Sequence, residues 1–238
     1  MGVKRILKNI LPIKILSLLQ KLKKQLNNNY VNKSYSQEGE DLILNKIFEC
    51  KQNGFYVDVG AHHPKRFSNT YLFYQKGWNG INIDAMPGSM NLFKKYRPRD
   101  INIEAAIAKE KTEMSFFMFD EPALNTFDRN LAAERIAHGW KLLKEQSAIA
   151  TPLKEILNSN LVSQQKIDFM SIDVEGLDLE VLYSNDWQAF KPEYILIECL
   201  NLSITKLSTN ETYQFLIQQG YELFAKTCRT LIFKTSGL

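Results

Sequence analysis

Short apolar runs alternate with amphipathic segments from about residue 39 to the end of the sequence. Apolar runs bounded by turn residues are typical of buried strands, whereas apolar residues at helical spacing indicate helices packed on a sheet. Strands that alternate with helices predict one doubly wound α/β domain, with helices on both faces of a parallel sheet. The predicted strands span 55–60, 80–85, 101–108, 113–119, 167–174, 193–199, 221–227 and 230–235, and the predicted helices span 39–50, 68–77, 89–96, 131–146, 153–160, 177–184 and 211–220.

A different pattern precedes this domain. Residues 1–26 carry apolar side chains close to a 3.6-residue period, which predicts a basic amphipathic helix with a kink near Pro12. Lys14 interrupts the apolar run below the roughly 18 residues that a membrane-spanning helix needs, and no small-residue cleavage site follows. We expect this helix to lie on an anionic membrane, to dock a partner, or to pack against its own domain or a second copy. The sequence places the domain boundary between residues 1–33 and residues 34–238.

Charge and cysteine content limit the classes of partner and site that the sequence is expected to have. The formal net charge is +4, but residues 1–37 hold eight basic residues and no acidic one, so the remainder carries −4. A nucleic-acid-binding domain is expected to spread its basic residues over the folded surface, so the sequence argues against a nucleic-acid partner. The three cysteines have neither the even count of a disulfide framework nor the spacing of a zinc site. We expect a cytoplasmic protein, which residues 1–26 could hold at the inner face of the membrane.

Acidic residues follow most of the predicted strands. In doubly wound sheets ligands bind beyond the carboxyl ends of the strands, so these acids are candidates for a binding site. Each of them could instead cap a helix or a connecting loop, but five strand ends in register favour a ligand site. The acids are Asp58, Asp84, Glu104, the pair Asp173 and Glu175, and Glu198.

The first two strands predict a nucleoside site. Gly60, after the first strand, would let the backbone approach a ligand, and Asp84, which follows Asp58 by 26 residues, could accept both hydroxyls of a ribose. His62 and Lys65 occupy positions where a dinucleotide-binding fingerprint has glycines, and no P-loop occurs in the sequence. NAD and nucleotide phosphates are therefore not expected. A nucleoside cofactor without phosphates remains, and S-adenosylmethionine fits because its cationic sulfonium suits a site ringed by carboxylates.

The sequence resembles the FkbM-type family of S-adenosylmethionine-dependent methyltransferases in SQEGEDLIL (36–44), FYVDVGAHHPKRFSNTYLFYQKGWNGINIDAMP (55–87), LNTF (124–127) and MSIDVEGLDLEVL (170–182). The likeness spans about residues 34–200. It implies a class I, Rossmann-like methyltransferase fold with a mostly parallel seven-stranded sheet, and usually O-methylation of sugars or natural products. Asp84 departs from the glutamate that is more usual in the family, but the shorter carboxylate can still accept both ribose hydroxyls.

The resemblance also implies a set of cofactor-site residues. Ser36, Gln37 and Glu40 would close over the site, and the end of the third strand adds Glu104 and Ala105. The residues that would line it are Asp58, Gly60, Ala61, Asp84 and Ala85.

Two adjacent histidines, His62 and His63, follow the first strand. Methyl transfer to a hydroxyl requires that the hydroxyl be positioned and relieved of its proton, and histidine is a natural base near neutral pH. Either histidine could instead cap the turn before Pro64. Asp173 and Glu175 compete for the same catalytic role, could orient a histidine, or could cap the following helix and bind the methionine amine.

Two further features bear on catalysis and specificity. Asp173 and Glu198 end neighbouring strands, so their carboxylates could hold a divalent metal such as Mg²⁺, and a metal-free reaction with a histidine base is the alternative. Residues 120–150 form a long connection of the kind that often covers such a site. Its Trp140, Arg129, Arg135 and His138 would suit a sugar, although Trp140 could equally pack into the core.

The sequence therefore predicts an S-adenosylmethionine-dependent O-methyltransferase that acts on a sugar hydroxyl in surface polysaccharide or glycan biosynthesis. The expected partner is a sugar, nucleotide-sugar or glycan acceptor. A lipid or small natural product as acceptor, and a non-catalytic nucleoside-binding domain, remain the alternatives.

Overall fold

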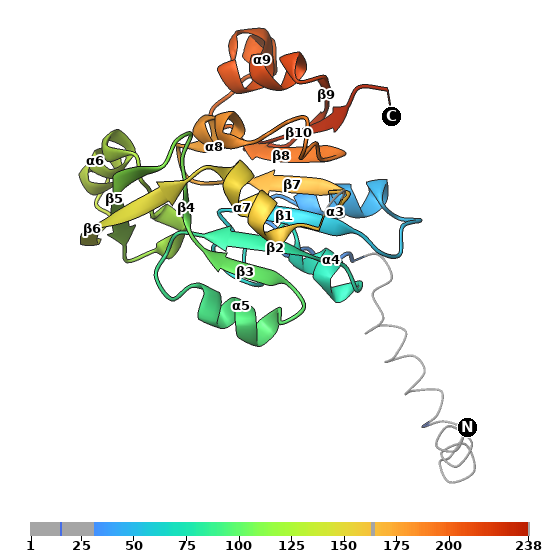
Figure 1. The fold of residues 1–238 in the computed structure, drawn as a ribbon, viewed down its shortest axis with the longest axis horizontal. Helices are drawn as coiled ribbons and strands as arrows, with labels where there is room; N and C mark the ends of the chain where they lie inside the picture. The colour runs from blue at the N-terminus through green and yellow to red at the C-terminus, as the bar shows by residue number, and fades with distance from the viewer. Residues whose placement is uncertain (1–14, 16–30, 163–164, 238) are drawn as a thin grey trace. The chain divides into compact units, whose positions relative to one another are not determined.

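The computed structural model describes Ile15, residues 31–162 and residues 165–237. The helix predicted over residues 1–26 lies outside the described residues apart from Ile15, so its membrane, partner and self-association roles stay predictions. No helix in the described part of the chain is long and apolar enough to cross a membrane. The fold described below is that of the unit formed by residues 34–238 (Figure 1).

The unit is built on a seven-stranded sheet with the order β3-β2-β1-β7-β8-β10-β9. All neighbouring strands are parallel except β10, which runs antiparallel to β8 and β9. The strand order reverses between β1 and β7, which is the place where doubly wound sheets bind ligands. The mostly parallel sheet predicted from the sequence is confirmed. Its strands are β1 (Phe55–Val59), β2 (Asn79–Asp84), β3 (Ile101–Glu104), β7 (Phe169–Ile172), β8 (Tyr194–Glu198), β9 (Tyr221–Lys226) and β10 (Thr230–Thr235).

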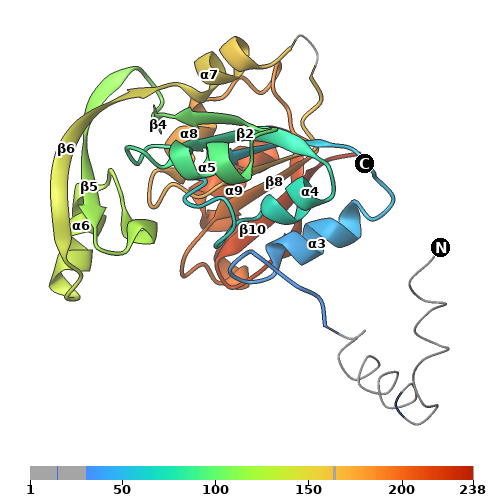
Figure 2. The same ribbon diagram turned by 90° about the horizontal axis from the view of Figure 1, so that it is seen from below.

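Helices cover both faces of this sheet, as Figures 1 and 2 show. Alternate residues of β1 supply the two cores: Val57 and Val59 face one layer of helices, and Tyr56 faces the other. The first layer consists of α7 (Leu153–Asn160), α8 (Asp178–Ser184) and α9 (Glu211–Gln218). The second contains α3 (Glu40–Ile47) and α4 (Tyr71–Gln75), and α5 (Met90–Tyr96) lies beside β3.

A second sheet, of three strands, carries the predicted insertion and lies to the left in Figures 1 and 2. Its order is β4-β6-β5, with β4 (Ala106–Ile107), β5 (Thr112–Phe119) and β6 (Leu142–Thr151). The short helix η1 (Pro122–Leu124) and α6 (Arg129–Ala137) connect β5 to β6. The strand predicted over 101–108 is broken at Ala105 into β3 and β4, which belong to different sheets. The strand predicted over 113–119 is β5, and it lies in the three-stranded sheet.

The helix predicted over 131–146 is wrong in its second half. α6 ends at Ala137, Gly139 follows with a left-handed φ of +91°, and the chain then forms β6 from Leu142. Leucine, lysine, glutamate and glutamine favour helices locally, but β6 pairs with β5 from Leu142 to Ala150, and this non-local pairing prevails. The other predicted helices and strands are present with ends shifted by a few residues.

Candidate functional site

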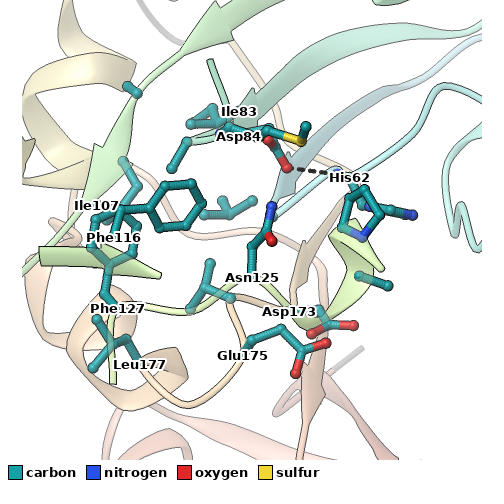
Figure 3. Close-up of a pocket in the computed structure, with 18 of the residues that line it drawn as sticks. His62, Ile83, Asp84, Ile107, Phe116, Asn125, Phe127, Asp173, Glu175 and Leu177 are labelled. Atoms are coloured by element: carbon teal, nitrogen blue, oxygen red, sulfur yellow. Dashed lines mark hydrogen bonds between the residues drawn. The ribbon is translucent and has the colours of Figure 1, made fainter. Parts of the chain in front are cut away.

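A cavity that opens to solvent lies beyond the carboxyl ends of β1, β2 and β7 (Figure 3). The lining changes from apolar to polar across the cavity. Ile107, Phe116, Phe127 and Leu177 line one side, and His62, Asp173 and Glu175 line the other, with Asp84 and Asn125 between them.

The structure divides the predicted cofactor residues into two groups. Three predicted residues, Ala61, Asp58 and Glu104, lie away from the cavity. Ala61 packs against Met90 and Phe93 of α5, Glu104 accepts the backbone N–H of Gly88 at 2.7 Å, and Asp58 is buried in the core. Ser36 lies just before α3, where its Oγ accepts the N–H of Gly39 at 3.1 Å. The residues that line the cavity are Gln37, Gly60, Asp84, Ala85 and Ala105.

Asp84 is held at the cavity wall by two backbone donors. The N–H of His62 donates to its Oδ2, and the N–H of Met86 donates to its Oδ1, both at 2.8 Å. Burial raises the pKa of Asp84, and these two N–H donors oppose the rise. Each carboxylate oxygen can accept more than one hydrogen bond, so Asp84 can still bind two ligand hydroxyls.

Asp58 lies in the core rather than at the cavity wall. Its position in the alternation of β1 places it on the same face as Tyr56, under the helices, and it accepts a 2.6 Å hydrogen bond from Thr70 Oγ1. The fully buried Arg97 donates to Thr70 Oγ1 at 2.9 Å and pairs with Asp100 at 2.8 Å. Burial raises the pKa of Asp58 to about 6. Asp58 therefore belongs to a buried polar network that fixes β1.

Gly60 is required by a contact within the protein. It has a φ of +83°, and a Cβ at this position would lie 1.7 Å from the backbone carbonyl oxygen of Asp173. The ends of β1 and β7 therefore approach more closely than any other residue would allow. This contact, and not only the approach of a ligand, explains the glycine that follows the first strand.

The two histidines are in different environments. His62 lines the cavity with φ +51°, and its buried Nε2 has no hydrogen-bond partner among the described residues. Burial, with a smaller effect from Arg66, lowers the pKa of His62 to about 4, so the ring is neutral near pH 7. His63 does not line the cavity: its Nδ1 accepts the backbone N–H of Lys65 at 3.1 Å and that of Arg66 at 2.9 Å. That is the geometry of a turn cap.

Three carboxylates gather where β7 and β8 end. Asp173, Glu175 and Glu198 each place a ligand oxygen within 4.8 Å of the others, because β7 and β8 are parallel neighbours. Arg135 of α6 donates to the Glu175 carboxylate, whereas Oδ1 of Asp173 is buried with no partner in the described part of the chain. Such a group of oxygens could hold a hard divalent cation or share protons.

Burial raises the pKa of all three carboxyl groups. The pKa of Asp173 lies well above its ordinary value because of burial and the nearby Glu198. The pKa of Glu198 rises to about 8 through burial and then through Glu175 and Asp178. Burial also raises the pKa of Glu175, although Arg135 opposes the rise. Buried like charges at this spacing disfavour full ionisation, so the cluster retains a proton near neutral pH.

A smaller hollow adjoins the cavity beyond β7 and β8, and the two share Gln37, Phe67 and Asp173. Some of its polar groups already pair with each other: Asn69 donates to Ser171 Oγ at 3.0 Å, and Thr230 donates to Glu40 at 2.9 Å. The polar residues that line it include Glu40, Asn69, Ser171, Glu198, Arg229 and Thr230.

The insertion between β5 and β6 forms one wall of the cavity. Thr126 Oγ1 donates to the Glu175 carbonyl at 2.7 Å, and Arg66 makes two 3.0 Å hydrogen bonds to Glu121, so this wall is tied to the main sheet. Trp140 does not line the cavity and is 45% exposed, and the predicted sugar contacts Arg129 and His138 are exposed as well. Phe116 of β5 and the insertion residues Pro122, Ala123, Asn125 and Phe127 form this wall. The LNTF segment is the sequence signal for Asn125 and Phe127.

Comparison with known proteins identifies the family to which the chain belongs. The model of the methyltransferase FkbM domain family matches residues 58–223. No curated protein matches the chain.

Several solved methyltransferase structures match the chain at low identity and with TM-scores below 0.5. The chain is 12% identical to precorrin-6y C5,15-methyltransferase from Geobacter metallireducens, with 85% of this chain and 90% of that chain covered and a TM-score of 0.44. It is 10% identical to a TehB-like SAM-dependent methyltransferase from Corynebacterium glutamicum (94% and 100% covered, TM-score 0.43). It is also 10% identical to 1,6-didemethyltoxoflavin-N1-methyltransferase from Burkholderia thailandensis (95% and 91% covered, TM-score 0.43).

Proposed function

Because this chain belongs to the family of FkbM-domain methyltransferases, we propose that it methylates a sugar hydroxyl, on a nucleotide-sugar or a glycan of surface polysaccharide biosynthesis. The family makes the chain an S-adenosylmethionine-dependent methyltransferase, and the proposal adds the acceptor. The observation that carries it is the polar hollow beside the cavity, in which carboxylates, amides and hydroxyls converge.

The residues of the cavity fit S-adenosylmethionine, which supplies an electrophilic methyl group when bound. Phe116 and Phe127 give an apolar wall suited to the adenine, and Asp84 is an acceptor for the ribose hydroxyls. The carboxylates of Asp173 and Glu175 on the opposite side suit positive charge on the methionine part.

The lining of the hollow favours a hydroxyl-rich acceptor over a lipid. A sugar hydroxyl both donates and accepts hydrogen bonds, so it matches acceptors such as Glu198 and donors such as Arg229. A lipid chain would leave these groups without partners, and such desolvation costs on the order of 1–3 kcal/mol for each group.

Asp173 and Glu198 are the pair that we assign as proton acceptor. Asp173 lines both the cavity and the hollow, and Glu198 lines the hollow beside it. During transfer the acceptor oxygen forms a bond to the methyl carbon, the carbon–sulfur bond breaks, and the hydroxyl proton moves to this pair. A pKa of about 8 for Glu198 is close to the working pH, which general base catalysis requires. His62, with a pKa of about 4, is the weaker base.

The reaction that we propose needs no metal. Arg135 already places a positive charge on Glu175, one of the three carboxylates that could hold a divalent cation. The Asp173–Glu198 pair then serves as a base rather than as a set of metal ligands.

Mass spectrometry of nucleotide-sugars and surface glycans, incubated with the protein and S-adenosylmethionine, tests the acceptor class. We expect a mass gain of one CH₂ on a sugar, together with release of S-adenosylhomocysteine. A gain confined to lipids or to small natural products would overturn the sugar assignment. Absence of S-adenosylhomocysteine with every acceptor class would support a binding role without turnover.

A further inference from the structure

Asn125 reaches into the cavity from the insertion. It follows η1 and lines the cavity near Phe127. Figure 3 shows its carboxamide in the middle of the cavity, between Asp84 and Glu175. Its Oδ1 accepts the backbone N–H of Phe119 at 2.8 Å.

This hydrogen bond determines which way the carboxamide points. A backbone N–H can only donate, so its partner must be the oxygen, and the two N–H groups of Asn125 are left for the cavity. Among the described residues, Nδ2 of Asn125 donates no hydrogen bond. In Figure 3 this nitrogen lies on the side of Asp84.

The backbone on both sides of the carboxamide is also fixed. The N–H of Asn125 donates to the Pro122 carbonyl at 3.2 Å, and Thr126 exchanges hydrogen bonds of 2.9 and 3.1 Å with Phe117 of β5. The amide nitrogen is therefore presented to the cavity by a hydrogen-bonded segment, as an oriented donor that has no acceptor in the described part of the chain.

We propose that Asn125 Nδ2 donates a hydrogen bond to a ribose hydroxyl oxygen of S-adenosylmethionine. A ribose hydroxyl donates one hydrogen bond and accepts others, and the Asp84 carboxylate can only accept. Asp84 takes the hydroxyl hydrogens, and Asn125 supplies the donor that the hydroxyl oxygens still need. The insertion thus recognises the cofactor and does not merely cover it.

This inference rests on the cofactor of the proposed function and is independent of the acceptor. The test compares S-adenosylhomocysteine with its 2′-deoxy and 3′-deoxy analogues as calorimetric ligands of the full chain, for the parent and for Asn125→Ala. None of these three ligands uses the acceptor hollow, so failure of sugar methylation would leave this measurement unaffected. Asn130→Ala, on the exposed start of α6, is the matched control.

We expect Asn125→Ala to weaken S-adenosylhomocysteine binding by roughly tenfold. The parent and Asn125→Ala should bind one of the two deoxy analogues with nearly equal affinity, because that analogue lacks the accepting oxygen. A general disturbance of the cavity would instead weaken all three ligands by the same factor. That result, or an unchanged affinity for S-adenosylhomocysteine, would overturn the proposal.

Discussion

At the scale of single residues, cofactor affinity is expected to depend on the charge of Asp84. Asp84→Asn keeps the size of the side chain but replaces one acceptor oxygen by an NH₂ group, which can accept neither a ribose hydroxyl nor the backbone N–H that this oxygen binds. We expect S-adenosylmethionine to bind roughly tenfold to a hundredfold more weakly, as measured by titration calorimetry. Asp186→Asn is an exposed control: one oxygen of Asp186, Oδ1, accepts both backbone N–H groups, from Gln188 and Ala189, so the amide oxygen of asparagine keeps both hydrogen bonds. Equal affinity of Asp84→Asn and the parent would show that the ribose lies elsewhere.

Gly60 gives a second prediction at this scale. Gly60→Ala forces a Cβ to within 1.7 Å of the Asp173 carbonyl at a φ of +83°, so the strand ends must separate. We expect a loss of several kcal/mol in the free energy of unfolding, measured by urea denaturation. Gly139→Ala has a similar φ of +91° but no atom within 4 Å of the added Cβ, and should cost only about 1 kcal/mol. Equal effects of the two substitutions would contradict the close approach.

Single residues also show how far the sequence could predict the site. Asp84 and Asp173 could be placed beside the cavity, because the carboxyl ends of parallel strands meet at one edge. The face of the sheet to which Asp58 points depends on the pleat of β1 and on Arg97. Arg97 is distant in sequence and reaches Thr70, the hydrogen-bond partner of Asp58, only in the folded chain. Asn125 and Phe116 could not be assigned, since the path of the insertion is set by non-local strand pairing.

At the scale of elements, α6 is expected to be anchored through Arg135. Arg135→Gln leaves the partly buried Glu175 carboxylate without its cation, so we expect a loss of about 2 kcal/mol near neutral pH. Arg129→Gln, on the exposed side of the same helix, removes a surface pair with Glu145 and a contact with the Phe117 ring, and should change stability by less than about 1 kcal/mol.

The loss caused by Arg135→Gln should depend on pH. Without Arg135, the pKa of Glu175 rises further in the folded state than it already does through burial. When a carboxyl group has a higher pKa in the folded state than in the unfolded state, its contribution to stability is fully present below the unfolded-state pKa. That contribution is lost as the pH rises through the folded-state pKa. Urea denaturation should therefore show a small defect in mild acid and a larger one above neutral pH. A defect that is independent of pH would argue against the ion pair as its cause.

The elements themselves were predictable where local pattern and tertiary environment agree. α7 has the predicted bounds, because its apolar residues Leu153, Ile156 and Leu157 follow helical spacing and face the sheet. β6 was missed because its residues favour a helix and its strand form exists only through β5. The β3–β4 break was missed because no local signal at Ala105 marks the change of sheet.

At the scale of the whole molecule, the pH dependence of turnover distinguishes the two candidate bases. If the Asp173–Glu198 pair accepts the proton, kcat should rise with pH through about 8, the pKa of Glu198. Burial sets this pKa first, followed by the charges of Glu175, Asp178, Arg229 and Arg135, so the apparent pKa belongs to the cluster. A rise near pH 4 instead would identify His62. His62→Gln should leave the pH profile unchanged. EDTA should leave turnover unchanged. If EDTA instead abolished turnover and Mg²⁺ restored it, a metal-dependent reaction would be favoured.

The central claim is that the bound methyl group is transferred to a sugar oxygen in the hollow beside Asp173 and Glu198. The most direct measurement uses S-adenosylmethionine with an isotope-labelled methyl group, a nucleotide-sugar panel, and NMR to locate the label in the product. We predict that the label appears on a sugar oxygen with the parent protein and is nearly absent with Glu198→Gln, which still binds the cofactor. A label on a nitrogen, or equal labelling of the sugar by Glu198→Gln, would contradict the account.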